Sequence, residues 1–314
     1  MQESAPVILT PAQTRTLDLL RRSAEPTVFD SSFVDELRDE ATEAFAAFHE
    51  RLGERTLFVT KYTLSKVHGC EVHYLAPEQF EWTPARARGQ VAHKAIQLLV
   101  NWKGEPTPRD LVDDALARLA DEERDFGRWI AALSPGDEAE LRGAAIERVN
   151  KFVETFPPLD KRSNPATEAA AQWPLDDPIL LRARVDLVMG RPEGRESRKL
   201  IIDLKTGRVS AQHREDLRFY ALVETLVRDV PPRKLATFYL DSAAPVVEDV
   251  TEPLLRAALR RTLDGIHAII ELENEERPPV KRTGASCRWC PVSADCPEGT
   301  AHMRGDEPEF DGDD

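Results

Sequence analysis

The stretch KLIIDLKTGRVS, residues 199–210, decides how the rest of this chain is interpreted. Its apolar first half predicts a buried strand, and Thr206-Gly207 predicts the turn that ends the strand. Side chains alternate between the two faces of a strand, so Asp203 and Lys205 point the same way. We therefore expect a carboxylate and an amine side by side at the end of a buried strand, where a cleft can open.

A second acid stands in a similar apolar setting, in ILLRARVDLVMG at residues 179–190. This pattern predicts a strand that also ends by presenting one acid, Asp186. Buried carboxylates are costly unless they are paired or bound to a metal, and two on neighbouring strands repel each other. A divalent cation between Asp186 and Asp203 would resolve this repulsion, and hard oxygen ligands suit Mg²⁺ or Mn²⁺.

Lys205 would lie beside such a metal, where an amine can stabilise a pentacovalent phosphate or orient a water molecule. A plainer interpretation stays open at this point. Asp186 and Asp203 could be caps at strand ends, or Asp203 could form an ion pair with Lys205.

Further candidate residues follow the same order along the chain. His93, in RGQVAHKAI, lies at the edge of the apolar face of a predicted helix, where a lone histidine is more often a satisfied core residue. Glu168, in NPATEAAAQW, is a possible further acid ahead of the two strands. Asp216 and Tyr220 stand four residues apart on the helix predicted after the second strand, so they share one face.

Taken in order, Gly-x3-His, Glu, Asp, Asp-x-Lys-Thr-Gly and a helix with Leu-x-x-Tyr resemble the RecB-like branch of the PD-(D/E)xK nuclease superfamily, over roughly residues 57–300. The resemblance implies that His93, Asp186 and Asp203 bind the catalytic metal ions. It also implies that Lys205 serves the attacking water. The full catalytic set that it implies is Asp186, Asp203, Lys205, Glu168 and Tyr220.

One position departs from the family pattern. The helix of the family usually carries Gln-x3-Tyr, and here the Gln position is Asp216. An aspartate is shorter and acidic, and it accepts hydrogen bonds but cannot donate as an amide does. The departure bears on the substrate-positioning role of this helix rather than on the metal site.

The chain has four cysteines, Cys70, Cys287, Cys290 and Cys296. We expect ligands or plain thiols rather than a disulfide framework. One early and three late cysteines resemble the iron–sulfur subgroup of the family, which includes CRISPR-associated RecB-like exonucleases and the nuclease domain of AddB. The resemblance implies a structural 4Fe–4S cluster. The alternative is a buried Cys70 thiol and a zinc ion held by the other three with His68, His73 or His302.

The charge balance limits the partners that we expect. The net charge is −14, which argues against general binding to nucleic acid, although the last ten residues alone hold six acids. A local basic channel for DNA remains possible beside the motifs. The basic residues that cluster there in sequence, and that are otherwise solvated surface, are Lys61, Lys66, Arg86, Arg88, Arg208, Arg214 and Arg218.

Composition and segment order define the expected organisation. We predict a helical region at 1–56, a nuclease domain at 57–302 with a helical insertion at about 101–160, and a disordered acidic tail at 303–314. The expected fold class is α/β, with a restriction-endonuclease-like core sheet flanked by helices and a C-terminal cysteine staple. The sequence predicts no transmembrane helix and no signal peptide, so the cytoplasm is the expected compartment.

These features favour a metal-dependent DNA nuclease, and the resemblance implies an exonuclease acting on single-stranded ends, in DNA repair and recombination or in CRISPR-type processing. A second hypothesis is a non-catalytic DNA-binding or assembly module that keeps the nuclease fold. A third is a zinc-stapled protein without a role at nucleic acid. The chain carries no recognisable nucleotide-binding loop, so work on duplex ends would need a helicase or CRISPR-type protein as a partner.

Overall fold

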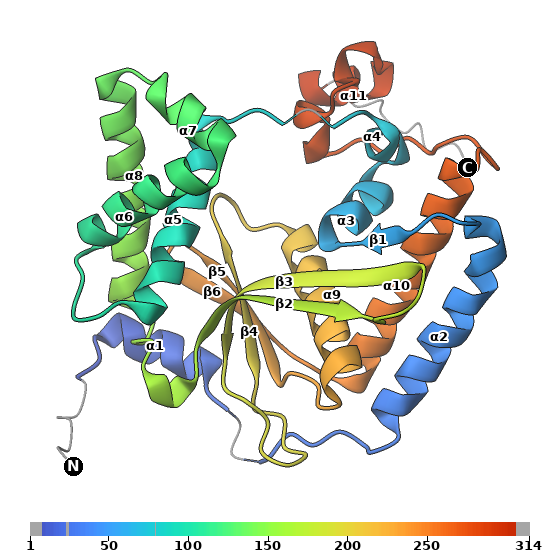
Figure 1. The fold of residues 1–314 in the computed structure, drawn as a ribbon, viewed down its shortest axis with the longest axis horizontal. Coiled ribbons are helices and arrows are strands. Elements are labelled where there is room, and N and C mark those ends of the chain that lie inside the picture. Colours follow the sequence, from blue (N-terminus) through green and yellow to red (C-terminus); the bar gives the residue numbers. More distant parts are fainter. Residues whose placement is uncertain (1–7, 23–24, 79, 306–314) are drawn as a thin grey trace, which may run out of the picture.

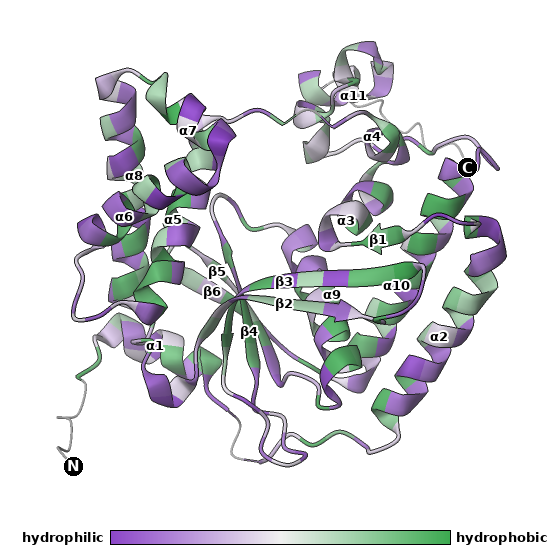
Figure 2. Ribbon diagram, in the orientation of Figure 1, coloured by the Kyte–Doolittle hydropathy of each residue, from purple (hydrophilic) through white to green (hydrophobic). Residues whose placement is uncertain are grey.

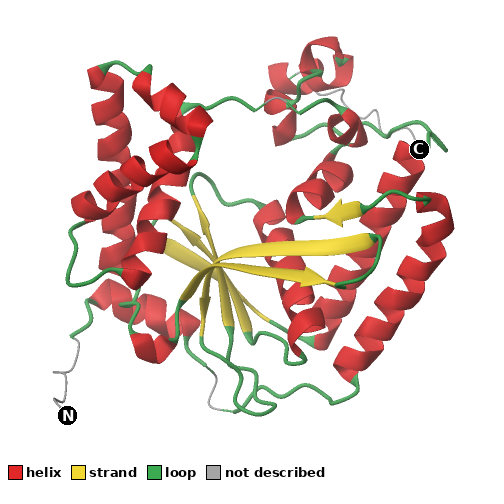
Figure 3. Cartoon of the chain, viewed as in Figure 1, coloured by secondary structure: helices red, strands yellow, loops and turns green. Residues whose placement is uncertain are grey.

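The computed structural model describes residues 8–22, 25–78 and 80–305, and its centre is a mixed sheet with the strand order β1-β3-β4-β5-β6 and β2 paired to β3 (Figures 1 and 3). The strands are β1 (Leu57–Val59), β2 (Ala166–Trp173), β3 (Ile179–Met189), β4 (Leu200–Lys205), β5 (Lys234–Tyr239) and β6 (Ala244–Asp249). The pairs β1–β3 and β4–β5 are parallel, and the other pairs are antiparallel.

Helices cover both faces of this sheet (Figure 1). The N-terminal and middle helices are α1 (Pro11–Leu20), α2 (Phe33–Leu52), α3 (Lys61–Gly69), α4 (Glu71–Leu75), α5 (Pro84–Asn101), α6 (Pro108–Glu122), α7 (Arg124–Ala131) and α8 (Pro135–Thr155). The later ones are α9 (Ala211–Arg228), α10 (Glu252–Glu273) and α11 (Pro297–Arg304), and the short 3₁₀ turns are η1 (Lys161–Ser163), η2 (Ala285–Trp289) and η3 (Ser293–Asp295). The predicted α/β fold class, a central sheet flanked by helices, is confirmed.

The two faces of the sheet bury separate hydrophobic clusters. One contains side chains of α2, α3, α9 and α10, and the other contains side chains of α5, α6 and α8. Along β4, Ile201 belongs to the first cluster, while Ile202 and Leu204 belong to the second. This is the alternation that the sequence predicts for the strand. Figure 2 shows the result: the strands are mostly hydrophobic, and the helices are hydrophilic on their outer sides.

One edge of β3 is shared between two strands. Its first residues pair with β1, from Leu57↔Ile179 to Val59↔Leu181, and its last residues pair with β4, from Leu187↔Ile202 onward. Between these two contacts, residues 182–186 pair with no strand on that edge in the described part of the chain. The strand β4 therefore separates from β3 near Asp186, which leaves room for a site inside the sheet.

Asp186 differs from the prediction in its place along the strand. The sequence predicts that the acid stands at the strand end, whereas β3 continues past it to Met189. The strand continues because β2 pairs along almost its whole length, from Trp173↔Leu181 to Ala166↔Val188.

The helical insertion also differs in detail from the prediction. The sequence predicts two helices in residues 108–156, and the structure has three, because Glu123 adopts an extended conformation between α6 and α7. The turn allows α7 to fold back against α6. A Cβ on Gly127 would lie only 2.5 Å from the carbonyl oxygen of Ala120, so the close approach depends on that glycine.

The predicted division into regions stays a prediction. Helix α2, from the predicted N-terminal region, packs on α9 and α10 of the predicted nuclease domain, and its side chains Leu37 and Phe45 are buried in the first cluster. Most of the predicted acidic tail, residues 306–314, lies outside the described residues. Within the described ranges, no helix is long and apolar enough to cross a membrane.

Candidate active site

The predicted acid of β4 lies at the centre of a charged cluster. Asp203 is fully buried, with 0% of its surface exposed. Lys205 Nζ lies 2.6 Å from Asp203 Oδ2, and Lys61 Nζ lies 3.2 Å from Oδ1. The ion pair with Lys205 was the plainer interpretation of the motif. The second lysine comes from the first turn of α3, directly after Thr60, whose side chain caps that helix.

Lys61 is a site residue that the sequence reasoning missed, because it was counted only among basic residues near the motifs. Its ammonium group also lies 4.9 Å from the centre of the Tyr220 ring. Burial lowers the pKa of Lys61, but the negative charges of Asp203, Asp186 and Asp216 outweigh burial and raise it. Lys61 is therefore a permanent positive charge inside the site.

Asp186 is fixed beside Asp203 by the backbone of the neighbouring strand. Its Oδ2 accepts a hydrogen bond of 2.7 Å from the N–H of Leu204, at the point where β4 leaves β3. His93 Nδ1 lies 3.7 Å from the same oxygen. Burial alone would raise the pKa of Asp186. The neighbouring His93, Lys61 and Lys205 lower it by more than burial raises it, so the pKa falls below its ordinary value. Asp186 is thus held as a carboxylate.

The glycine four residues before His93 has a packing role. A Cβ on Gly89 would lie 3.2 Å from Thr206 Oγ1, which is tighter than an ordinary contact. Glycine lets α5 lie directly on the turn that follows Lys205. One turn further along α5, His93 reaches Asp186. The Gly-x3-His spacing therefore positions the imidazole at the site.

Glu168 lies on β2, next to the same carboxylate. The pairing of β2 with β3 includes Thr167↔Leu187 and Ala169↔Val185, but Glu168 does not pair with Asp186 between them. Glu168 has a φ of 51°, which is rare for residues other than glycine. Burial and then the charge of Asp186 raise its pKa. The strand is distorted where two acids would face each other.

Helix α9 closes the site from one face of the sheet. Tyr220 is buried, and burial, followed by the charges of Asp203 and Asp186, raises its pKa, so its hydroxyl keeps its proton. Asp216, which replaces the family glutamine, is also buried, and burial raises its pKa. Its Oδ1 accepts a hydrogen bond of 2.9 Å from Gln212 Nε2. With Asp186 of β3 and Asp203 of β4, Asp216 of α9 is the third acid that acts on Lys61.

The predicted metal ligands lie close together without forming a ready-made cage. Among the described residues, no group of three or more His, Cys, Asp or Glu side chains is arranged to hold a metal ion. Both oxygens of Asp203 face lysine ammonium groups instead. Yet buried Asp203 Oδ2 accepts no hydrogen bond of acceptable geometry. The neighbouring side chains that could bind a metal are carboxylates and an imidazole. That donor chemistry fits Mg²⁺ or Mn²⁺.

Two of the four cysteines lie close together. A Cβ on Gly299 would lie 3.4 Å from Cys296 Sγ and 3.6 Å from Cys287 Sγ, so these two sulfurs flank one glycine. Cys70 lies between α3 and α4. Lys281 Nζ forms an ion pair of 3.0 Å with Glu298, which follows Cys296 by two residues.

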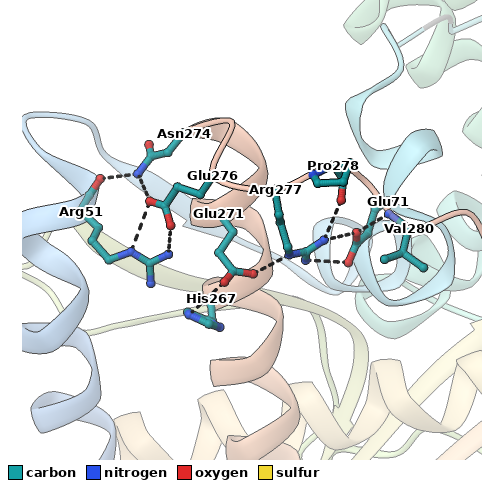
Figure 4. Close-up of polar contacts among 9 residues, drawn as sticks. All are labelled: Arg51, Glu71, His267, Glu271, Asn274, Glu276, Arg277, Pro278 and Val280. Atoms are coloured by element: carbon teal, nitrogen blue, oxygen red, sulfur yellow. Dashed lines mark hydrogen bonds and ion pairs between the residues drawn. The ribbon is translucent and has the colours of Figure 1, made fainter.

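A buried ion pair fastens the C-terminal segment beside Cys70 (Figure 4). The carboxylate of Glu71 accepts hydrogen bonds from Arg277 Nη1 at 2.6 Å and Nη2 at 2.9 Å, and from the N–H of Val280 at 2.7 Å. Arg277 Nε also donates to Glu271 of α10 at 2.7 Å. The chain that leaves α10 is therefore turned back across α4, which carries the late cysteines toward the early one.

The zinc alternative requires a histidine near the cysteines that can bind the zinc ion in place of a thiolate. His68 Nε2 lies 2.9 Å from the carbonyl oxygen of Arg261, so His68 faces α10. Burial lowers the pKa of His73, and Lys66 lowers it further. Because His68 already contacts this carbonyl oxygen, the structure argues against the version of the zinc alternative in which His68 binds the zinc ion.

Residues 60–297 match the family model of the PD-(D/E)XK nuclease superfamily. The match spans more than half of the chain, and it contains every candidate catalytic residue described above. The chain belongs to the PD-(D/E)XK nuclease superfamily.

Comparison with individual proteins adds little to this assignment. No curated protein matches the chain. A similar solved structure is that of a protein from Eubacterium rectale provisionally named an exonuclease, with 11% identity and a TM-score of 0.43, covering 82% of this chain and 96% of that one. Another is the protein called SSO0001, with 17% identity and a TM-score of 0.30, covering 67% of this chain and 95% of that one. Similarity this low carries no argument about activity.

Proposed function

We propose that the protein is a metal-dependent nuclease that hydrolyses phosphodiester bonds in DNA, as an exonuclease on single-stranded ends. The observation that supports this most directly is the meeting of Asp186, Asp203 and Lys205 where β4 leaves β3, in a chain of the nuclease superfamily. Buried acids that repel each other beside lysines are costly to maintain, and a catalytic site explains their retention.

A divalent cation, when bound, would activate a water molecule and offset the charge of the phosphate. Asp186 and Asp203 would hold the cation through carboxylate oxygens, together with His93. Lys205 would orient the attacking water, since its amine already lies 2.6 Å from Asp203. Lys61 would bind a phosphate oxygen of the substrate.

Two further residues have narrower roles in this proposal. Glu168 would complete the acidic side of the site, next to Asp186. Tyr220 keeps its proton, so its hydroxyl would donate a hydrogen bond to an oxygen of the substrate or the water. These roles follow the family pattern and the placement of both residues around Lys61 and Asp186.

The test is an anaerobic cleavage assay on end-labelled single-stranded and double-stranded DNA with Mn²⁺, Mg²⁺ or EDTA. We expect cleavage with either metal and none with EDTA. Asp203→Asn should reduce cleavage ~10²-fold or more, because the charge that holds the cation is lost while the shape is kept. Asp249→Asn is the control, since Asp249 is an exposed acid paired with Lys234. Undiminished cleavage by Asp203→Asn would contradict the assignment.

The same assay addresses the second candidate, a DNA-binding or assembly module without catalysis. Asp216 in place of glutamine, together with the ion pairs that already neutralise Asp203, favours this candidate. It predicts that DNA binds equally well with EDTA, and that no metal and no strand type supports cleavage by well-folded protein.

We further propose that Cys70, Cys287, Cys290 and Cys296 hold a structural 4Fe–4S cluster. The contact of Cys287 and Cys296 around Gly299, and the Glu71–Arg277 pair beside Cys70, support it. Brown protein containing iron and sulfide is the expected result, and colourless protein containing zinc would support the alternative. The pathway that we propose is DNA repair and recombination or CRISPR-type processing, with a helicase or CRISPR-type protein that opens duplex ends.

A further inference from the structure

Two hollows on the surface join into one groove beside the active site. The first has a volume of about 850 Å³ and the second about 690 Å³. They share four lining residues, Ala85, Thr206, Arg288 and Trp289. The volumes fall in the range of pockets that hold ligands of nucleotide size. We call this the Trp289 groove.

The Trp289 groove lies between three parts of the fold: the start of α5, the turn at residues 206–210 after β4, and η2 of the C-terminal segment. In Figure 1, the green helical insertion and the red C-terminal segment stand on the two sides of this region. The groove thus depends on elements that are distant in sequence.

The larger hollow of the groove carries positive side chains that lack an acidic partner. Arg88, Arg208 and Arg288 line it, and within the described residues none of the three forms an ion pair or a hydrogen bond. The Nε of Arg88 is buried without a partner. Arg148 also lines the groove, but it forms an ion pair of 2.5 Å with Asp241. In a chain with a net charge of −14, three unpaired arginines around one hollow are a local exception.

Trp289 supplies an aromatic surface in the same place. The residue is 65% exposed although it is the largest apolar side chain of η2, and it lines both hollows. An exposed indole gains from contact with a flat apolar partner. A nucleic-acid strand combines phosphates, which guanidinium groups bind, with flat bases that can stack on an indole.

The groove leads into the proposed catalytic site. Thr206, which lines both hollows, directly follows Lys205. His213 lines the larger hollow, and its Nδ1 lies 2.9 Å from the hydroxyl oxygen of Tyr239, the residue of β5 that pairs with Lys205 of β4. A strand lying in the groove would therefore reach Asp203 from the side of Lys205, opposite the contact of Lys61 with the other carboxylate oxygen.

We propose that the Trp289 groove holds the single-stranded part of the substrate, with a base stacked on Trp289 and backbone phosphates bound by Arg88, Arg208 and Arg288. This inference rests on the proposed nuclease function and specifies its substrate as an unpaired strand. Bases of a duplex are stacked on each other, so an indole can accept a base only from a strand that is open.

The test separates binding from cleavage by using EDTA throughout. Affinity for a fluorescently labelled single-stranded oligonucleotide is measured for the wild type, Trp289→Ala and Trp289→Phe. Loss of stacking in Trp289→Ala should weaken binding roughly ten-fold or more, and Trp289→Phe, which keeps an aromatic ring, should recover most of the affinity. A duplex of the same sequence should bind more weakly and respond less to these changes.

Arginine variants test the groove independently of the tryptophan, which stands between two cysteines. Arg208→Ala, in an exposed turn, should make the dependence of log K on log salt shallower by about 0.7 for a single strand. Arg260→Ala is the matched control, because this exposed arginine of α10 also lacks an ion pair in the described structure but lines no part of the groove. It should leave the slope unchanged.

The outcomes distinguish this inference from the proposed function. Binding that depends on Trp289 and Arg208, in a protein that never cleaves, would support the groove and refute the nuclease. Cleavage that depends on Asp203, with equal affinity in wild type, Trp289→Ala and Arg208→Ala, would overturn the groove and leave the nuclease. Equal loss in Trp289→Ala and Trp289→Phe would also overturn base stacking.

Discussion

At the scale of single residues, Glu168 shows backbone strain at the site. Its φ of 51° lies in the left-handed region, which costs a residue with a side chain about 1 kcal/mol or more. The strain occurs where Glu168 would otherwise face Asp186 across the strand pair. Where backbone strain and repulsion between two acids coincide, we expect function rather than stability to decide the residue.

We therefore expect Glu168→Gly to stabilise the fold while lowering cleavage. The glycine relieves the backbone strain, and the change also removes a charge beside Asp186, so the free energy of unfolding should rise by about 1 kcal/mol. Glu275→Gly is the control, since Glu275 has a φ of 56° on the exposed surface. Urea denaturation of both variants separates the two effects. A less stable Glu168→Gly would mean that the carboxylate is needed for the fold.

The residue scale also marks a limit of sequence reasoning. The pattern of β4 predicts that Asp203 and Lys205 share a face, because alternation is a local property of a strand. Lys61 could not be predicted in the same way, since its contact with Asp203 joins positions 142 residues apart. A lysine directly after a short apolar strand and a capping threonine was the only signal available.

At the scale of elements, the separation of β4 from β3 creates the site. The N–H of Leu204 loses a strand partner there and donates to Asp186 Oδ2 instead. A side-chain carboxylate thus replaces a backbone acceptor at the junction of two strands. The same feature explains why the predicted position of Asp186 at a strand end was wrong: the site opens within the sheet.

Asp186→Asn and Asp186→Ala should therefore differ in stability although both lose cleavage. Asparagine keeps an oxygen for the N–H of Leu204, whereas alanine leaves this donor without a partner, at a cost of about 1–3 kcal/mol. Denaturation in urea with EDTA measures the difference. If the two variants unfold at the same urea concentration, the hydrogen bond is not what joins β4 to the site.

Elements also differ in how well the sequence predicts them. The long amphipathic helices and β4 have strong periodic signals, and they occur where expected. The edge strand β6 was missed, because its exposed and half-buried residues, APVVED, carry little hydrophobic pattern. Helix α7 was missed as a separate element, because the break at Glu123 comes from packing around Gly127 rather than from a proline or glycine at the break.

At the scale of the whole molecule, the chain that follows α10 is joined to α4. The Glu71–Arg277 pair fixes the segment after α10 to α4 through two hydrogen bonds (Figure 4). The same segment continues to η2 and therefore to Trp289 and the groove. The resemblance to the iron–sulfur subgroup implies the join between Cys70 and the late cysteines, but nothing in the sequence indicates Arg277, which contacts Glu71 across 206 residues.

Breaking this pair should release the C-terminal segment while the sheet stays folded. Arg277→Ala leaves the buried Glu71 carboxylate without its main partner, at a cost of about 3 kcal/mol or more. Hydrogen exchange should become faster in residues 278–304 and in α4, with little change in β4 and α9. Iron content and affinity for single-stranded DNA should fall together, because the three late cysteines and Trp289 lie on the released segment.

Arg51→Ala is the control, because Arg51 of α2 pairs with a residue that also lies just after the end of α10. Arg51 pairs with Glu276 at 2.5 Å, next to Arg277 in the chain, but on the side of α2 (Figure 4). Both partners are more exposed than Glu71, so this loss should destabilise the protein much less than Arg277→Ala and leave the exchange of residues 278–304 unchanged. If Arg51→Ala loosens the segment as much as Arg277→Ala does, the join depends on the end of α10 as a whole. If only Arg277→Ala does so, one buried ion pair links the cysteine segment to the catalytic sheet.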